Sequence, residues 1–369
     1  MKQKSIPKDS IRRILILGSI GIGNLLLFSP CLRVIRKSFP HAHITMIVLK
    51  KAFVDLYEGD PALNEIIVAD YAIQNTWWKR IQLIMTLRKK KFDVCFTTFP
   101  SNRIEYNLLP FLIGVKYRIA HRYRTKYLRT CSFLQNVKVP VDVTLHDLEQ
   151  NSNLLKPLGL ESHVEKKITM YLSEENRSCA EQFLYKNTIP LKSLIIGIHA
   201  GSSIERDMHL KRWAAENFIQ LCQKIIQKYQ AFFLIFGGPE EREIKHSIAQ
   251  SINDKSISVD GVSLKTTAAL IERCHLFISN DSGLMHIAVG VGVPCAAIFG
   301  PTDPGRTSPY GSRNRIIRLG LPCSPCWSIT NVGIGHITCI YPINRCLSEL
   351  TVQHVYDEIN SMLSAIKNA

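Results

Sequence analysis

The feature that most constrains the fold is a repeated alternation of short apolar runs with longer amphipathic segments. Short apolar runs are typical of strands buried on both faces of a parallel sheet, and helix-length segments between them predict crossover helices. One series predicts strands at 14–17, 44–48, 66–68 and 94–97. A second series predicts strands at 194–199, 232–236, 276–279 and 295–299. The sequence therefore predicts an α/β protein with two parallel sheets.

A chain of 369 residues is too long for one ordinary core, so two sheets imply two domains. The stretch 158–190 is polar and charged and lies between the two series, and we expect the hinge there. We predict a first domain at 1–170, a second at 171–350, and a helix at 351–369 that packs back toward the first domain. Two such domains facing each other leave a central cleft at the carboxyl ends of their strands, where ligands usually bind.

The net charge of +16 is concentrated in the first half of the chain. Residues 1–160 hold 25 Lys and Arg against 11 Asp and Glu, whereas the remainder holds 21 against 19. This surplus predicts an anionic partner, which could be nucleic acid, a membrane leaflet or a phosphorylated substrate. The segment 116–129 has six Lys or Arg, three Tyr and no acid, and it predicts an anion-binding patch with Arg122, Arg124 and Lys126. A solvated basic face is the alternative.

An uncharged stretch at 14–32 follows a basic N-terminal segment, a pattern that is typical of a signal anchor. Gly18, Gly21, Gly23 and Pro30 interrupt it, which favours a buried strand, a glycine loop and a helix start. No other stretch approaches the length of a membrane span. Seven of the eleven cysteines are scattered singly, as suits a reducing compartment, so we expect a cytoplasmic protein.

The other four cysteines crowd into residues 323–346, as Cys323, Cys326, Cys339 and Cys346. A C-x-x-C pair with two further cysteines can close a tetrahedral zinc site. The second pair is separated by six residues, which is a loose spacing, and reduced, packed thiols are the interpretation we favour.

The sharpest motif spans 279–304, where a predicted strand runs into Asn280-Asp281-Ser282-Gly283 and then into a helix. Asp281 or Ser282 can cap this helix, and its first free amide groups suit a phosphate, while a carboxylate suits sugar hydroxyls. His286 follows Ser282 by four residues and so shares its helical face. A capped helix with a core histidine is the alternative for this segment alone.

A second motif spans 197–213, where a buried strand ends in Ala200-Gly201-Ser202-Ser203. The hydroxyl and amide groups of such a turn can hold phosphate oxygens. Lys211 and Arg212 follow before the next helix, and cations beside the turn can balance the charge of a diphosphate where no metal is present. Alone, this segment is more typical of a solvated loop.

Together the two motifs resemble glycosyltransferase family 9, the bacterial heptosyltransferases. The resemblance rests on the serine turn, on the run Lys211-Arg212-Trp213, on the segment from Asn280 to His286, and on FGPTDP at 299–304. It extends to SPCLRVIRKSFP at 29–40 and to the last helix, so it covers most of the chain. It implies a GT-B fold with two facing Rossmann-like domains, the first for the acceptor and the second for a nucleotide-sugar donor.

The resemblance also implies roles for individual residues. The donor diphosphate would lie against Ser202, Ser203 and Lys211, with Lys211 stabilising the departing charge. The same site would be lined by Asp281, Ser282, Gly283 and His286. Glu240 or Glu241 matches the family's ribose-binding acid, and we favour Glu241. No metal and no other cofactor is expected.

One position departs from the family pattern. The opening loop of family members ends in Gly-Asp, and that Asp is the presumed general base, whereas this chain has Gly23-Asn24. An amide cannot take a proton at any useful pH. The family's Arg before the loop is also replaced, by Gly18.

The sequence thus predicts an inverting glycosyltransferase that moves a sugar, heptose from ADP-heptose by resemblance, onto a lipopolysaccharide core or related glycan. Its expected partners are the nucleotide-sugar donor, an anionic glycolipid acceptor and the cytoplasmic face of the inner membrane, bound peripherally. One alternative is a family member without catalysis that binds nucleotide sugar or lipopolysaccharide. A nucleic-acid-binding protein is a weaker alternative, because the near-neutral second half carries the donor-type motifs, and we expect no nucleic-acid partner.

Overall fold

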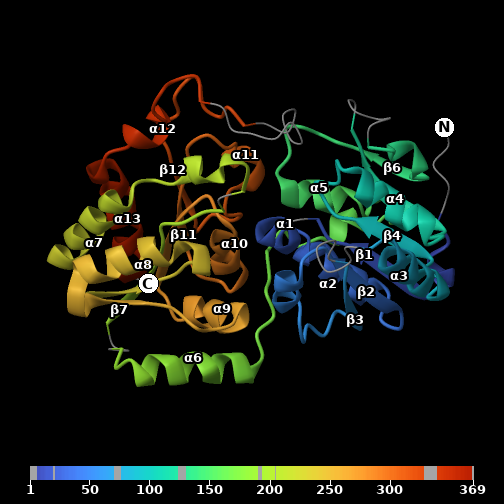
Figure 1. Cartoon of the computed structure of the whole chain (residues 1–369), viewed down its shortest axis with the longest axis horizontal. Coiled ribbons are helices and arrows are strands. Elements are labelled where there is room, and N and C mark those ends of the chain that lie inside the picture. Colours follow the sequence, from blue (N-terminus) through green and yellow to red (C-terminus); the bar gives the residue numbers. More distant parts are fainter. Residues whose placement is uncertain are drawn as a thin grey trace. The chain divides into compact units, whose positions relative to one another are not determined.

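The computed structural model describes residues 6–19, 21–69, 76–123, 130–189, 193–203, 205–327 and 339–367. The chain divides into two compact units, Met1–Tyr171 and Leu172–Ala369. Each unit contains one six-stranded sheet in which every neighbouring pair of strands is parallel. Two parallel sheets covered by helices confirm the predicted α/β fold class (Figure 1).

The sheet of the first unit has the strand order β3-β2-β1-β4-β5-β6. Its strands are β1 (Arg13–Leu17), β2 (His43–Val48), β3 (Glu65–Val68), β4 (Val94–Thr97), β5 (Tyr117–Arg122) and β6 (Val137–Pro140). The helices are α1 (Ile22–Leu26), α2 (Ser29–Ser38), α3 (Trp77–Lys89), α4 (Ile104–Leu112) and α5 (Asp147–Asn153). β1 lies at the centre of this sheet, and all its residues after Arg13 are buried, as expected for a strand covered on both faces.

The sheet of the second unit has the order β12-β11-β10-β7-β8-β9. Its strands are β7 (Leu194–His199), β8 (Ala231–Ile235), β9 (Ser256–Ser258), β10 (Leu276–Asn280), β11 (Cys295–Ile298) and β12 (Arg315–Ile317). The helices are α6 (Glu174–Lys186), α7 (Ala215–Lys228), α8 (Arg242–Ile252), α9 (Leu264–Glu272), α10 (Gly283–Gly290), α11 (Pro304–Thr307), α12 (Arg345–Ser348) and α13 (Val352–Lys367). β7 and β10 are neighbours at the centre, so the loops that follow them lie side by side.

The C-terminal helix α13 packs against α7 of the second unit, and the two helices lie together in Figure 1. Its apolar face, which includes Val355, Ile359 and Leu363, is part of the second core. This corrects the expectation that the helix packs back toward the first domain, because the stripe that such packing would use is already buried in the second unit.

Other sequence expectations also differ from the structure. The expected hinge at 158–190 contains a helix, α6, which packs against α9. The helix start expected after the glycine loop within 14–32 corresponds to two helices, α1 and α2. Four further strands, β5, β6, β9 and β12, extend the sheets at positions where no strand was expected. The uncharged stretch at 14–32 forms β1, α1 and the start of α2, and within the described residues no helix combines the length and apolarity of a membrane span.

Candidate functional site

A buried ion pair lies at the carboxyl end of β10. Lys211, at the end of the short 3₁₀ helix Glu205–Lys211, places its Nζ 2.7 Å from Oδ2 of Asp281. The two side chains are only 15% and 7% exposed, and the Thr302 hydroxyl donates to the same carboxylate oxygen at 2.7 Å. Burial would raise the pKa of Asp281, but the charge and hydrogen bond of Lys211 and the bond from Thr302 bring that pKa below its ordinary value. The carboxylate is therefore ionised and orients the ammonium group.

A second buried carboxylate is held by His199, the last residue of β7. The ring Nε2 of His199 lies 3.0 Å from Oε2 of Glu241, which also accepts the Gly238 amide at 2.8 Å. Burial opposes ionisation of Glu241, yet the hydrogen bond and charge of His199, the Gly238 amide and the charge of Arg212 lower its pKa. Because an ionised carboxylate only accepts, Nε2 donates to it.

The other side of the His199 ring faces the start of α10. Its Nδ1 lies 2.8 Å from the Ser282 hydroxyl, and Ser279 lies 3.5 Å from the same nitrogen. Ser282 occupies the position before α10, but its side chain makes no cap bond to the helix amides. The Ser282 hydroxyl makes its hydrogen bonds with His199 and Ser279 instead. Ser282 therefore does not cap α10 with its side chain, contrary to the expectation from the sequence. The amides of the first turn are left facing the strand ends, where an anion can reach them.

The serine turn after β7 is packed tightly against Glu241. A Cβ placed on Gly201 would lie 1.8 Å from the Glu241 carboxylate, so only glycine fits at that position. The Ser202 hydroxyl donates to the Met208 carbonyl at 2.8 Å and accepts from Arg212 Nε at 3.2 Å. Ser202 is buried and holds the turn, whereas Ser203 is exposed. Of the two serines assigned to the diphosphate, the structure leaves Ser203 at the surface of the turn.

Gly283 and His286 belong to α10. Gly283 is its first residue and is half-buried. His286 is buried, one turn further on, and it is close enough to Asp281 to contribute to lowering the pKa of that carboxylate. The structure thus brings together six of the predicted donor residues around the ends of β7, β8 and β10: Lys211, Glu241, Asp281, Ser282, Gly283 and His286.

The four C-terminal cysteines line one cavity of about 150 Å³ together with Leu210, which precedes Lys211 in the chain, and Pro301. They are Cys323, Cys326, Cys339 and Cys346. The Lys211 ammonium sits 5.6 Å from the centre of the Trp327 ring, and the Trp327 amide donates to the Pro301 carbonyl at 2.9 Å. Burial and the neighbouring thiols raise the pKa of Cys346 to about 11, so this thiol is neutral. Among the side chains that the structure describes, no three His, Cys, Asp or Glu are grouped to hold a metal ion.

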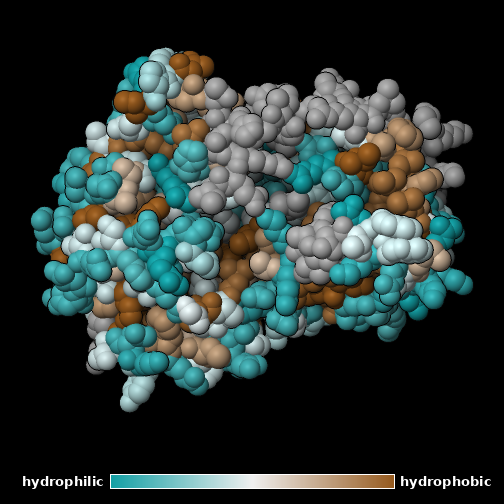
Figure 2. Space-filling model, in the orientation of Figure 1, coloured by the Kyte–Doolittle hydropathy of each residue, from teal (hydrophilic) through white to brown (hydrophobic). Residues whose placement is uncertain are grey.

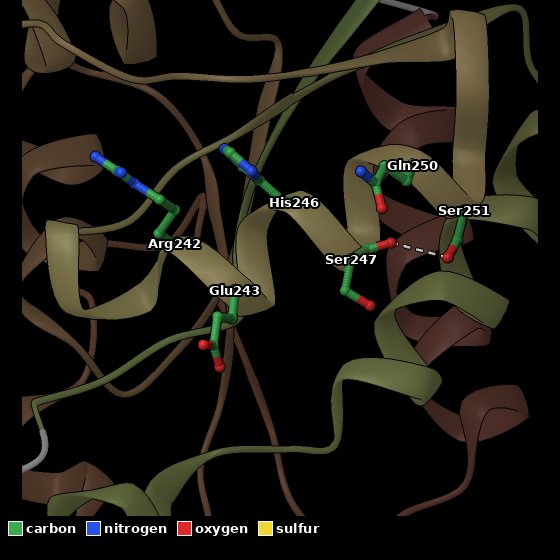
Figure 3. A pocket seen from close by; sticks show the side chains of 6 residues that line it. All are labelled: Arg242, Glu243, His246, Ser247, Gln250 and Ser251. Carbon is green, nitrogen blue, oxygen red and sulfur yellow. Dashed lines mark hydrogen bonds between the residues drawn. The ribbon is translucent and has the colours of Figure 1, made fainter.

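A second hollow lies over α8 and has a volume of about 530 Å³. It is lined by one exposed side of that helix, as Figure 3 shows for Arg242, Glu243, His246, Ser247, Gln250 and Ser251. All its lining residues come from one helix, and none is a strand-end residue. A shallow recess of this kind lacks the converging polar groups of a ligand site, so the candidate site remains at the strand ends.

In the first unit, Asn24 lies in α1, after the loop that follows β1, and is half-buried. The Gly18 position has no room for a side chain, because a Cβ there would lie 2.5 Å from Leu25 Cδ2 and 3.1 Å from the Ile47 carbonyl oxygen. This packing explains why the arginine expected from the family pattern cannot be accommodated here. The neighbouring loop after β4 contributes Thr98, whose hydroxyl accepts the Ser19 amide at 2.7 Å.

The structure describes residues 116–123 of the basic segment 116–129. Its first part is the strand β5, and Arg118 within it donates to the Val115 and Leu134 carbonyls at 2.7 and 2.9 Å. Arg122, at the end of β5, is exposed. Arg124 and Lys126 lie outside the described residues.

Sequence reasoning gave no role to three residues that hold the site together. They are His199, Asn280 and Thr302. Asn280 accepts the Trp213 amide at 3.0 Å and donates to the Ala200 carbonyl at 2.7 Å, so it joins the two motif loops. The sequence did contain a signal for Asn280, which ends the buried strand β10. A polar residue at that position lies at the ligand-binding edge of a parallel sheet.

Two Rossmann-like units, one with paired charges and an uncapped helix start at its central strand ends, define an α/β protein with a candidate anion-binding site. The model of glycosyltransferase family 9 (heptosyltransferase) matches residues 80–333. The chain belongs to this family.

Relatives and solved structures agree with this assignment. Lipopolysaccharide heptosyltransferase 2 of Escherichia coli K12 is 25% identical over 377 residues, which cover 95% of this chain and 98% of the relative. Lipooligosaccharide heptosyltransferase 2 of Campylobacter jejuni serotype O:6 is 33% identical over 186 residues, and this match covers 48% of the chain and about half, 55%, of the relative. A family 9 glycosyltransferase of Veillonella parvula superposes with a TM-score of 0.77 at 23% identity, covering 98% of this chain and all of the other. The ADP-heptose heptosyltransferase II structure of E. coli gives 0.73 at 21%, covering 97% and 100%. The chain therefore has the predicted GT-B fold.

Proposed function

We propose that the chain is an inverting glycosyltransferase that moves heptose from ADP-heptose onto a lipopolysaccharide core or related glycan. The observation that carries the proposal is the pair of carboxylates, Asp281 and Glu241, held ionised beside the start of α10 by Lys211 and His199. The names of the E. coli and C. jejuni relatives support heptose as the sugar.

The proposed roles follow from charge and position. The diphosphate of the donor lies against the first amides of α10, Lys211 and Ser203, while Glu241 accepts hydrogen bonds from ribose hydroxyls. When the acceptor hydroxyl attacks the anomeric carbon, the bond from that carbon to the diphosphate oxygen breaks, and negative charge grows on the diphosphate. A lysine already aimed by Asp281 stabilises this charge without reorganisation, which is the most effective form of electrostatic catalysis. No metal is required for this step.

The acceptor is proposed to bind the first unit, at the start of α1, which contains Asn24. An amide there can orient a hydroxyl but cannot deprotonate it. The anionic part of the acceptor is proposed to contact Arg122, Arg124 and Lys126, at the cytoplasmic face of the inner membrane. Neutralising these three side chains together should raise the KM for a phosphorylated core acceptor and leave the KM for the donor unchanged.

Transfer is tested by mixing the protein with ADP-heptose and a lipid A–core acceptor that lacks the heptose, and by measuring ADP release and product mass. Stoichiometric release with the acceptor present, and little without it, is the expected result. A protein that binds ADP-heptose but releases no ADP with any core acceptor would instead be the non-catalytic binding protein, which Asn24 at the base position favours.

A further inference from the structure

Helix α3 (Trp77–Lys89) has two apolar faces. The inner face, with Leu83, Ile84 and Leu87, packs on the core of the first unit. On the outer face the apolar residues are exposed by 60%, 64%, 42% and 51%, and they are Trp77, Trp78, Ile81 and Met85. A helix at the surface of a globular domain needs only its inner stripe, so the outer one marks a surface that meets an apolar partner.

The chemistry of the outer face is that of an interfacial helix. Trp77, Ile81 and Met85 follow one another at intervals of four residues, which places them on one side of α3. The Trp77 and Trp78 rings stack with their centres 3.9 Å apart. Tryptophan combines a large apolar ring with one N–H donor, and for this reason it is concentrated where lipid chains meet headgroups.

The neighbouring helix α4 (Ile104–Leu112) packs on the same core and continues this surface. It exposes Phe111 by 45%, and the Arg118 guanidinium lies 5.5 Å from the centre of that ring. Figure 2 shows hydrophobic residues gathered over α4 on the visible face of the first unit. Arg88 of α3 donates to the Leu112 carbonyl at 3.1 Å, which ties the ends of the two helices together.

The charge around the outer face selects one kind of partner. Residues 76–91 contain six Lys and Arg and no Asp or Glu. Lys90 is paired with Glu65 at 2.7 Å, while Arg88 and Lys89 are exposed where the apolar stripe ends. An apolar stripe bordered by cations fits an anionic lipid surface, which offers acyl chains and phosphates together.

We propose that the outer face of α3 docks this protein on an anionic lipid bilayer. Trp77 and Trp78 lie in the headgroup region, and Arg88 and Lys89 contact lipid phosphates. The inference rests on the proposed function, in which the acceptor is a glycolipid. It assigns the contact with the bilayer itself to α3, while the segment 116–129 keeps its proposed contact with the anionic part of the acceptor.

The test uses the full-length protein with two kinds of vesicle: phosphatidylcholine alone, and phosphatidylcholine with phosphatidylglycerol at a ratio of about 7:3. The wild type should pellet with the mixed vesicles at low salt, and its tryptophan emission should shift to the blue and be quenched by brominated lipid. Trp77→Ser/Trp78→Ser should weaken this binding about tenfold or more. Arg88→Gln/Lys89→Gln should weaken it roughly fivefold per charge.

The matched control is Tyr185→Ser on α6, because the Tyr185 ring is 89% exposed in the second unit and should leave vesicle binding unchanged. The variants alter exposed side chains, and an unchanged melting temperature shows that each is folded. Equal pelleting of wild type and the Trp variant would overturn the proposal. So would a dimer in solution that the Trp variant abolishes without any vesicle binding, since α3 would then face a second copy of the chain.

Transfer assays separate this inference from the proposed function. With a water-soluble core oligosaccharide, the Trp variant should retain wild-type kcat and KM, whereas with acceptor embedded in mixed vesicles its rate should fall about tenfold. Vesicle binding through α3 without transfer to any acceptor would leave the docking surface standing and refute the transferase. Transfer to both acceptors at equal rates by wild type and variant would refute the docking surface alone.

Discussion

The ion pair between Lys211 and Asp281 allows the structural and binding roles of one lysine to be separated. We consider Lys211→Met, Asp281→Asn and the double variant, all close in volume to the native side chains. Since the two side chains are 15% and 7% exposed, removing one partner leaves a charge that is largely buried. Such a loss costs about 3 kcal/mol at the lower end of measured values, while replacing both partners is close to neutral.

The expected stability changes are large enough for simple thermal melts. The second unit, 172–369, has 198 residues, for which 1 kcal/mol corresponds to roughly 2–4 °C. Lys211→Met should therefore lower the melting temperature by roughly 6–12 °C, and the double variant should recover most of this loss. The double variant should still bind ADP roughly thirtyfold more weakly, because a charge contact to a diphosphate is worth about 2 kcal/mol.

The pH dependence provides a further check on the same pair. The folded pKa of Asp281 is below its ordinary value of 3.8, so the stability it contributes is present above that value and is lost as the pH falls through the folded pKa. In Lys211→Met, the lysine no longer opposes the effect of burial, so the pKa of Asp281 is raised. Protonation of the carboxylate at low pH then removes the cost of burying its charge. The stability gap between wild type and variant should therefore begin to narrow as the pH falls through the raised pKa of the variant, above 3.8, and continue to narrow as the pH falls through the lowered pKa of the wild type. A double variant as unstable as the sum of the two single variants, or a gap independent of pH, would refute the coupling.

Three further predictions concern chelation, packing and the acceptor side. Transfer, or ADP affinity in the absence of transfer, should survive EDTA, and a loss restored by magnesium in calorimetric titrations would contradict a metal-free site. Gly201→Ala should lower the melting temperature and the ADP affinity through its collision with Glu241, and Gly201→Ala/Glu241→Ala should restore the melting temperature but not the affinity. Asn24→Ala should lower ADP release with core acceptors while leaving ADP affinity unchanged. An inactive wild type beside an active Asn24→Asp would show that the amide does not orient an acceptor, since a positioned base is worth about 10²–10⁴-fold.

The sequence predicted the central strands well, and the reason is their burial. β1, β2, β7 and β10 are mostly apolar because both faces of a central strand are covered. Strands further from the centre of each sheet, such as β5 and β12, lack this pattern. β5 begins Tyr-Arg-Ile and β12 is the three residues Arg315–Ile317, and neither contains an apolar run long enough to distinguish it from a loop.

The sequence also predicted several residues that lie together at the candidate site, but not how they contact one another. Lys211 and Asp281 stood in separate motifs, and nothing in their spacing of seventy residues indicated that they pair with each other. The hydroxyl of Ser202 could not be assigned to an internal hydrogen bond, because its acceptor is the carbonyl of Met208 and carbonyl positions depend on the fold. Sequence motifs do not reveal contacts that involve backbone atoms, because these depend on the fold.

Trp213 links three distant segments of the second unit. Its amide donates to Asn280, its ring Nε1 donates to the Leu350 carbonyl at 2.9 Å, and α7, on which α13 packs, begins two residues later. Proteolytic trimming of α13 would thus expose the apolar side of α7 and release the Leu350 carbonyl from its ring partner. The loop that carries Lys211 would lose one of its anchors although no residue of that loop had been removed. We therefore expect the loss of α13 to weaken nucleotide binding at the proposed donor site, although no proposed donor residue lies in α13.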